Sequence, residues 1–156
     1  MNITDDPATF ANAIGERGRL LGLDLGTKTI GLARSDPSRS FASALTTLKR
    51  DKFAVAAADL ERHMRAEEAV GFVLGLPRNL DGSSGPRVQA TRAFARNLAA
   101  ALPQPILLWD ERLSTVEAER LMISADMRRS KRAEKIDQVA AAIILQGALD
   151  RLRSLG

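Results

Sequence analysis

The sequence predicts a mixed α/β fold, in which an antiparallel hairpin joins parallel strands in one sheet covered by helices. Two apolar runs, residues 19–25 and 29–35, flank the tight turn Gly26-Thr27-Lys28 and predict the hairpin. Helical and strand-like segments then alternate along the chain. Residues 136–151 keep apolar side chains at strict helical spacing, which predicts a long final helix against the sheet.

The other elements follow from apolar periodicity and turn signals. The five expected strands occupy residues 19–25, 29–35, 43–48, 70–76 and 106–109. The expected helices occupy residues 52–67, 86–101, 114–124 and 136–151. The third of these helices is expected because Ser114 and Glu117 have the spacing of a capping box. Pro77 ends the fourth strand, and turn-forming residues fill the following loop.

Residues 1–18 are interpreted as an N-terminal extension, and residues 19–156 as the functional domain. Asp6 and Pro7 suit the start of a helix, Phe10 and Ile14 could share one face, and Gly15 would end it. The extension is therefore expected to be a short helix or an irregular arm.

Composition limits the classes of function. With 156 residues, 45% hydrophobic and 27% charged, the chain fits one globular domain. It has no apolar run long enough to span a membrane, no cysteine and one histidine, so we expect a cytoplasmic protein without thiolate or zinc sites. The net charge of +4 suggests a polyanionic partner. The basic run at residues 128–135 would by itself be typical of a solvated face.

Acidic residues lie at three places where a site could form. Asp24 interrupts the apolar run of residues 20–25, where an ionised carboxylate needs a cation, a metal ion or an exposed strand end. Asp110 and Glu111 directly follow a buried strand, and Asp137 lies in the first turn of the final helix. Strand carboxyl ends are where sites assemble in α/β sheets.

Each acid also has a simpler interpretation. Asp24 could cap the turn at Thr27, Glu111 could pair with Arg112, and Asp137 could complement the helix dipole. Three acids together in a basic protein are better explained by Mg²⁺, which prefers oxygen ligands. Two such ions about 4 Å apart can hydrolyse a phosphodiester bond, while basic side chains outside the pocket position the nucleic acid.

Four stretches resemble the YqgF family in their order and spacing. They are Leu21–Gly31, Gly75–Gly82, Asp110–Thr115 and Lys135–Ala141. The family has an RNase H-like fold related to RuvC resolvases. Its members are associated with the processing of pre-16S rRNA and, in earlier proposals, with Holliday junction resolution. The resemblance extends from Arg19 to Leu152.

This resemblance implies a nuclease that depends on Mg²⁺ or Mn²⁺. Asp24, Glu111 and Asp137 would be the catalytic metal-binding triad, with Asp110 as a lower-ranked alternative to Glu111. The residues implied in substrate binding are Lys28, Arg78, Asn79 and Arg112. The implied substrate is structured RNA, with precursor rRNA or ribosomal precursor particles favoured over junction DNA.

Other interpretations are weighed against this one. Asp24-Leu25-Gly26-Thr27 also fits the phosphate-binding turn of the actin-like ATPases, but 156 residues leave no room for their second lobe. A P-loop is excluded by the spacing of Gly22, Gly26 and Lys28. A catalytically silent RNA-binding factor in ribosome assembly remains an alternative. The sequence leaves the oligomeric state open and reveals no self-association face. Met122, Ile123 and Met127 are candidates for one but are interpreted as ordinary core or rim residues.

Overall fold

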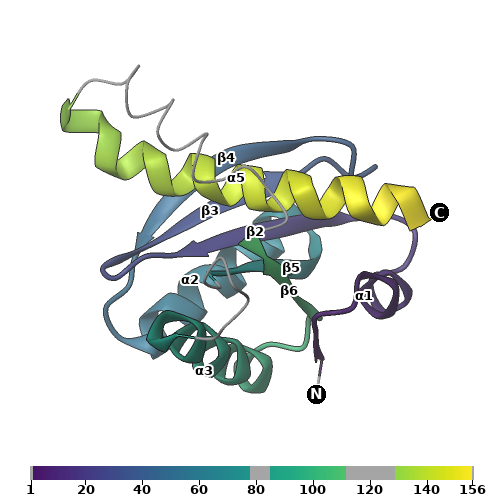
Figure 1. The fold of residues 1–156 in the computed structure, drawn as a ribbon, viewed down its shortest axis with the longest axis horizontal. Helices are drawn as coiled ribbons and strands as arrows, with labels where there is room; N and C mark the ends of the chain where they lie inside the picture. The colour runs from purple at the N-terminus through teal and green to yellow at the C-terminus, as the bar shows by residue number, and fades with distance from the viewer. Residues whose placement is uncertain (1, 78–84, 112–128, 156) are drawn as a thin grey trace.

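The computed structural model describes residues 2–77, 85–111 and 129–155, which form one six-stranded sheet with helices on both faces (Figure 1). The strands are β1 (Ile3–Thr4), β2 (Arg19–Leu25), β3 (Thr29–Ser35), β4 (Ala42–Lys49), β5 (Ala69–Leu76) and β6 (Ile106–Asp110). The helices are α1 (Pro7–Ile14), α2 (Phe53–Glu67), α3 (Pro86–Ala101) and α5 (Arg129–Leu155). The mixed α/β prediction is confirmed. The helix predicted at residues 114–124 lies outside the described residues.

The strand order is β1-β6-β5-β2-β3-β4. β2, β3 and β4 are antiparallel neighbours, whereas β2, β5, β6 and β1 run parallel. The predicted hairpin is therefore the β2–β3 pair, and parallel strands extend the sheet from β2. Because β2, β5 and β6 are parallel, their carboxyl ends meet at one edge of the sheet, which is also the edge of the β2–β3 turn.

The structure differs from the sequence prediction in having a sixth strand and a longer final helix. β1 has two residues, Ile3 and Thr4, which pair with Ile106 and Leu107 of β6. So short a strand has no periodicity to reveal it, and only its long-range pairing defines it. α5 begins at Arg129, ahead of the apolar stripe that starts at Ile136, because the basic run continues the helix.

The N-terminal segment packs onto this sheet. Asp6 caps α1 by accepting a hydrogen bond from the Thr9 amide at 3.2 Å, Pro7 occupies the first turn, and Gly15 ends the helix with φ 73°. Phe10 and Ile14 are buried. These observations confirm the helix predicted within residues 1–18.

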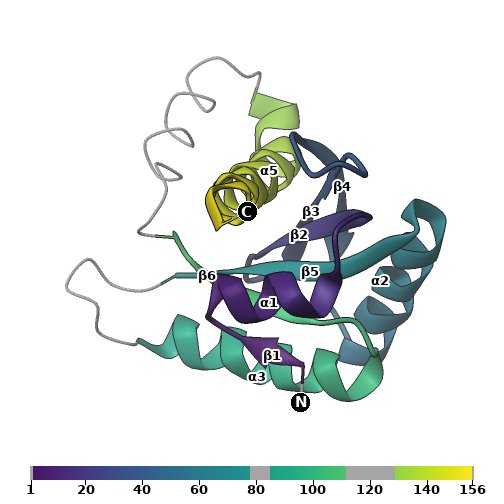
Figure 2. The ribbon, with the colours of Figure 1, turned by 90° about the vertical axis from the view of Figure 1, so that its right-hand side faces the viewer.

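Two apolar clusters fill the spaces on the two sides of the sheet (Figure 2). Strand alternation sorts the side chains of β2 between them. Leu21, Leu23 and Leu25 face α2 and α3, whereas Leu20 faces α1 and α5. In the described part of the chain, no helix combines the length and apolarity that crossing a membrane would need.

Helix α5 lies unusually close to the sheet because glycines replace side chains beneath it. A Cβ atom placed on Gly22 would lie 2.7 Å from Leu145 Cβ and 2.9 Å from the Ala141 carbonyl oxygen. On Gly31 it would lie 2.0 Å from the Asp137 carbonyl oxygen. No real side chain tolerates such distances, so these positions accept α5 only as glycine.

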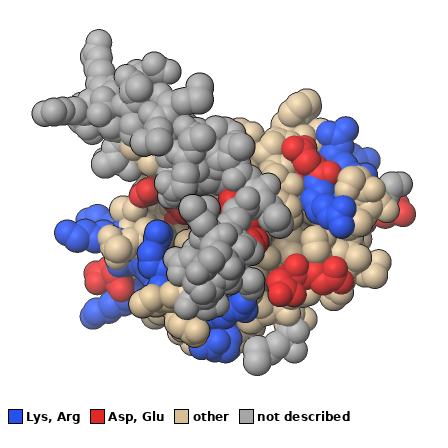
Figure 3. All heavy atoms as spheres, in the orientation of Figure 1, with Lys and Arg blue, Asp and Glu red and all other residues tan. Residues whose placement is uncertain are grey.

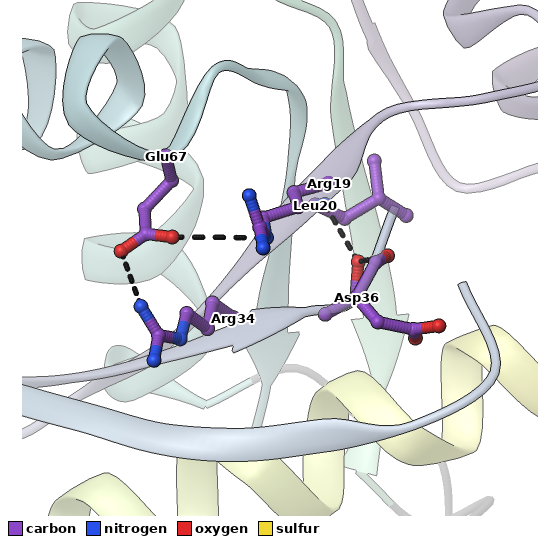
Figure 4. A network of polar contacts seen from close by, with 6 residues as sticks. Arg19, Leu20, Arg34, Asp36 and Glu67 are labelled. Atoms are coloured by element: carbon purple, nitrogen blue, oxygen red, sulfur yellow. Dashed lines mark hydrogen bonds and ion pairs between the residues drawn. The ribbon is translucent and has the colours of Figure 1, made fainter. Parts of the chain in front are cut away.

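A polar network ties the amino-terminal end of β2 to α2 (Figure 4). Glu67 receives a hydrogen bond of 2.6 Å from Arg34 and lies 3.8 Å from Arg19. Beside it, the Leu20 amide donates to Ser35 Oγ at 2.9 Å. The network fixes the hairpin at the end of β2 opposite Asp24.

The connection from β3 to β4 is organised by Asp36. Its carboxylate accepts hydrogen bonds from the Phe41 and Ser40 amides and from the Ser38 hydroxyl. These bonds, led by the one from Phe41, lower the pKa of Asp36 to about 2. Because the pKa falls on folding, the charged carboxylate stabilises the protein above its unfolded value near 3.8, and this contribution is lost as the pH falls toward 2.

We therefore expect Asp36→Asn to lower the free energy of unfolding at pH 7 by about 1 kcal/mol, a modest value because the group is near solvent. Urea unfolding of both proteins at pH 7 and pH 3 measures the difference. It should shrink at pH 3. An equal difference at the two pH values would contradict a role for the charge.

We expect Gly22→Ala to lower the free energy of unfolding by about 1–3 kcal/mol, because the added methyl group collides with α5. Whether stability falls or rises distinguishes a crowded position from an uncrowded one. In an uncrowded strand, alanine in place of glycine raises stability, since glycine loses more backbone freedom on folding. Urea unfolding is the measurement, and an unchanged or higher midpoint would mean that α5 does not approach β2 this closely.

Candidate metal-dependent active site

Asp24 is the buried acid of the sheet, with 5% of its surface exposed. It is the sixth residue of β2, close to the carboxyl end of the strand. Two residues before it, Gly22 lies against Leu145 and Ala141 of α5, so alternation directs Asp24 to the same face. The carboxylate is therefore held between the sheet and the final helix.

Asp137 reaches this face from α5. Its main chain rests on Gly31, where a Cβ atom would lie 2.0 Å from the Asp137 carbonyl oxygen and 2.9 Å from its Cβ. Gly31 is the β3 partner of Asp24 in the antiparallel register. Asp137 thus lies above the strand immediately beside Asp24.

Glu111 approaches from the other side of Asp24. It directly follows β6 and is half-buried. A Cβ atom placed on Gly75 of β5 would lie 3.4 Å from the Glu111 carboxyl carbon and 2.6 Å from Ile144 Cδ1 of α5. Continuing the β2–β5 register by one residue from the Leu23–Leu74 pair places Gly75 beside Asp24.

The three acids therefore stand over three adjacent strands, in the order Glu111 over Gly75, Asp24 on β2 and Asp137 over Gly31. We call this arrangement the acid row. Neighbouring strands lie about 4.8 Å apart, so the row spans roughly 10 Å. Within the described ranges, no three acidic or histidine side chains are already close enough to form a metal-binding group. The acid row is a set of neighbours facing one space and not a closed coordination shell.

Alternation separates Asp110 from this row. Trp109 and Leu107 belong to the cluster under α1 and α5, whereas Leu108 belongs to the cluster under α2 and α3. Asp110 has the parity of Leu108, and Glu111 has the parity of Trp109. Glu111 is thus the strand-end acid on the face of Asp24. Trp109 packs against Gly147 of α5, as expected for a packing residue. A Cβ atom placed on Gly147 would lie 3.2 Å from the indole nitrogen of Trp109.

Thr29 and Arg50 support the site, and neither was singled out from the sequence. The Thr29 hydroxyl donates a hydrogen bond to Asp137 Oδ2. The Gly26 amide donates to the Thr29 carbonyl at 2.8 Å, which closes the turn. Arg50, just after β4, donates from Nη1 to the Gly26 carbonyl at 2.7 Å and from its amide to the Lys28 carbonyl at 2.9 Å. The one feature of the sequence that could have indicated the role of Thr29 is its hydroxyl group directly after the Gly26-Thr27-Lys28 turn.

The predicted substrate-binding residues are only partly described. Lys28 is exposed on the β2–β3 turn, at the edge of the sheet where the acid row lies. Arg78, Asn79 and Arg112 lie outside the described residues, as do Met122, Ile123 and Met127. Their predicted roles stay predictions.

Comparisons with known proteins show the family of the chain. The family model described as "RuvX: Holliday junction resolvase" matches residues 18–151. A protein of Paracoccus denitrificans named "Putative pre-16S rRNA nuclease" is 58% identical over 154 residues, covering 99% of this chain and 98% of the relative. A protein of Rhodobacter capsulatus with the same name is 59% identical over 147 residues, covering 94% and 92%.

Solved structures support the fold alone. The structure of Thermus thermophilus RuvC in complex with a Holliday junction substrate has a TM-score of 0.54 at 13% identity, covering 88% of this chain and 97% of RuvC. A second structure of RuvC from Thermus thermophilus has a TM-score of 0.53, also at 13% identity, covering 86% and 96%. With the family model and the relatives, the motifs and the fold lead to one conclusion: the chain belongs to the RuvX/YqgF family of nucleases.

Proposed function

We propose that this protein is a nuclease dependent on Mg²⁺ or Mn²⁺ that matures precursor 16S rRNA in the cytoplasm, on free RNA or on ribosomal precursor particles. The observation that carries the proposal is the acid row, in which Asp24 lies on β2 while Glu111 and Asp137 stand over the neighbouring strands β5 and β3. The names of the Paracoccus and Rhodobacter relatives support the choice of substrate. We assign the chemistry to residues 19–156, because residues 1–18 contribute no acid to the row.

The residues of the acid row suit a hard divalent cation. All three offer carboxylate oxygens, which is the ligand type that Mg²⁺ and Mn²⁺ take in proteins. The glycines at positions 31 and 75 allow the close approach of α5 to the sheet, because a Cβ atom there would collide with the main chain of Asp137 or with the Ile144 side chain. A bound divalent cation would supply an activated water and neutralise charge developing on the phosphate.

Residues of the chain position the carboxylates of the acid row and the substrate. Asp24 is fixed by its buried strand, Asp137 is oriented by the Thr29 hydroxyl, and Glu111 enters from the end of β6. Lys28, exposed on the turn at the same edge, is suited to a phosphate of the substrate strand. Arg78, Asn79 and Arg112 are proposed to extend this contact. No protein nucleophile is required.

Holliday junction resolution is the second candidate, favoured by the description of the matching family model. Paired incision of a junction requires two active sites related by a two-fold axis, and hence a dimer, whereas trimming an RNA requires one site. A catalytically silent RNA-binding factor is the non-enzymatic alternative.

We expect the protein to cleave a labelled precursor 16S rRNA fragment in Mg²⁺ or Mn²⁺ and not in chelator. Asp24→Asn should reduce the rate at least about 100-fold, because one carboxylate of the row is lost. Asp150→Asn removes an exposed acid from the far end of α5 and serves as the matched control. Rates are measured on precursor RNA, unrelated single-stranded RNA and a four-way DNA junction.

The three arms of this assay separate the alternatives. Preferential cleavage of the junction by a dimer would replace the RNA proposal with resolution. Cleavage that persists in chelator would remove the metal mechanism. Tight RNA binding without turnover in any metal would leave the silent factor.

We expect Thr29→Val to raise the Mn²⁺ concentration needed for half-maximal cleavage by about 10-fold, because Asp137 loses the hydroxyl that orients it. Thr29→Ser keeps the donor and should restore the wild-type value. Direct titration of Mn²⁺ by calorimetry gives a readout independent of turnover. If the valine and serine variants bind Mn²⁺ equally, the hydroxyl does not position Asp137.

A further inference from the structure

A groove of about 310 Å³ lies between the start of α2 and the side of α3. It is on the face of the sheet opposite the acid row. The residues that matter for its chemistry are Arg50, Lys52, Phe53, Ala90, Phe94 and Asn97. We call it the Arg50 groove. Its volume is at the lower end of the range for small-molecule sites.

Charge and aromatic surface meet in this groove. The guanidinium of Arg50 lies 5.8 Å from the centre of the Phe94 ring, and the Phe53 and Phe94 rings are in edge contact with centroids 5.5 Å apart. The negative charge of Asp51 balances only one of the two positive charges of Arg50 and Lys52, so the groove has a net positive charge. Arginine planes and phenylalanine rings are surfaces on which unpaired bases stack, and Asn97 adds an amide able to bond a base edge.

Arg50 links the groove to the active-site edge. The same guanidinium that lies over Phe94 donates to the Gly26 carbonyl, in the turn whose Thr29 holds Asp137. A nucleic-acid strand that follows the turn past Lys28 would therefore reach the groove from the acid row. Lys and Arg side chains also gather over the left and lower parts of the face drawn in Figure 3, where Figure 1 places the β2–β3 turn, α2 and α3.

We propose that the Arg50 groove binds one unpaired nucleotide of the substrate strand, with its base on Arg50 and Phe53 and its phosphate at Lys52. The inference rests on the proposed nuclease function for its ligand class, but concerns binding and not cleavage. A base inside a duplex is stacked on both faces and cannot enter, so the groove would select strands that have an unpaired nucleotide.

The test measures binding of labelled oligonucleotides by fluorescence anisotropy. Every protein carries Asp24→Asn and the buffer contains chelator, so cleavage plays no part. Ala90→Glu places a negative charge in the groove, and its matched control Ala100→Glu changes an exposed alanine ten residues further along α3. Because both positions are exposed, both variants are expected to fold.

We expect Ala90→Glu to weaken binding of single-stranded RNA about 10-fold, as loss of one stacked base does, and Ala100→Glu to leave it unchanged. Binding of a fully paired RNA duplex should not distinguish the two variants. A loss confined to RNA, or one shared by single-stranded DNA of the same sequence, supports the site. Equal affinity of the two variants for single strands, or an equal loss on the duplex, would overturn it.

The salt dependence supplies a second measurement. Lys52→Gln should reduce the slope of log affinity against log salt by about 0.7, the value for one phosphate contact on a single strand. Arg62→Gln removes the same charge about 15 Å further along α2, beyond the Debye length at physiological salt, and should not change the slope. Equal slopes for the two variants would also overturn the proposal.

Failure of this inference is distinguishable from failure of the nuclease proposal. If the groove variants lose binding but wild-type protein cleaves no nucleic acid in any metal, the groove stands and the nuclease function falls. If metal-dependent cleavage is found and Ala90→Glu binds like Ala100→Glu, the function stands and the groove falls.

Discussion

The site depends on the close approach of α5 to the sheet. Helix and sheet normally keep a layer of side chains between them, but at Gly22 and Gly31 no side chain separates α5 from β2 and β3. The main chain of Asp137 then rests on the strand next to Asp24, and Gly75 opens the corresponding space for Glu111. Bulk at any of these glycines would lift the helix or close the space between the acids. The same glycines therefore determine both how α5 packs on the sheet and where the acids lie.

The alternation of side chains along each strand determines which acids lie on the face covered by α5. β2 carries Leu21, Leu23 and Leu25 toward α2 and α3, whereas Asp24 lies on the face covered by α5. At β6, parity selects Glu111 over its neighbour Asp110. The antiparallel β3 and the parallel β5 flank β2, so acids carried by a helix and by a strand end can meet Asp24 from its two sides.

Much of this was predictable from local patterns, and the remainder was not. The hairpin, the buried strands and the strand-end positions of Asp24 and Glu111 follow from periodicity and turns. Asp137, predicted in the first turn of the final helix, is instead the ninth residue of α5, because the helix begins at Arg129. β1 did not follow from these patterns, since two residues carry no period and β6 defines the strand. Thr29 looked like an ordinary strand residue because its partner is 108 positions away. Arg50 looked like a charged strand end because its bonds depend on how β4 meets the β2–β3 turn.

The contacts of Arg50 also bear on how the two faces of the sheet could work together. Gly26 and Lys28 belong to the turn that carries the acid row's hairpin, while Phe94 belongs to α3 on the opposite face. Arg50 therefore contacts elements on both faces of the sheet, through hydrogen bonds to the turn and through the Phe94 ring. A strand gripped beyond the edge would then reach the acids in a fixed register, without any need for the acids to recognise bases. Under the proposed function, the three carboxylates would supply the chemistry, and the Arg50 groove would select the position of cleavage by binding the substrate strand outside the acid row.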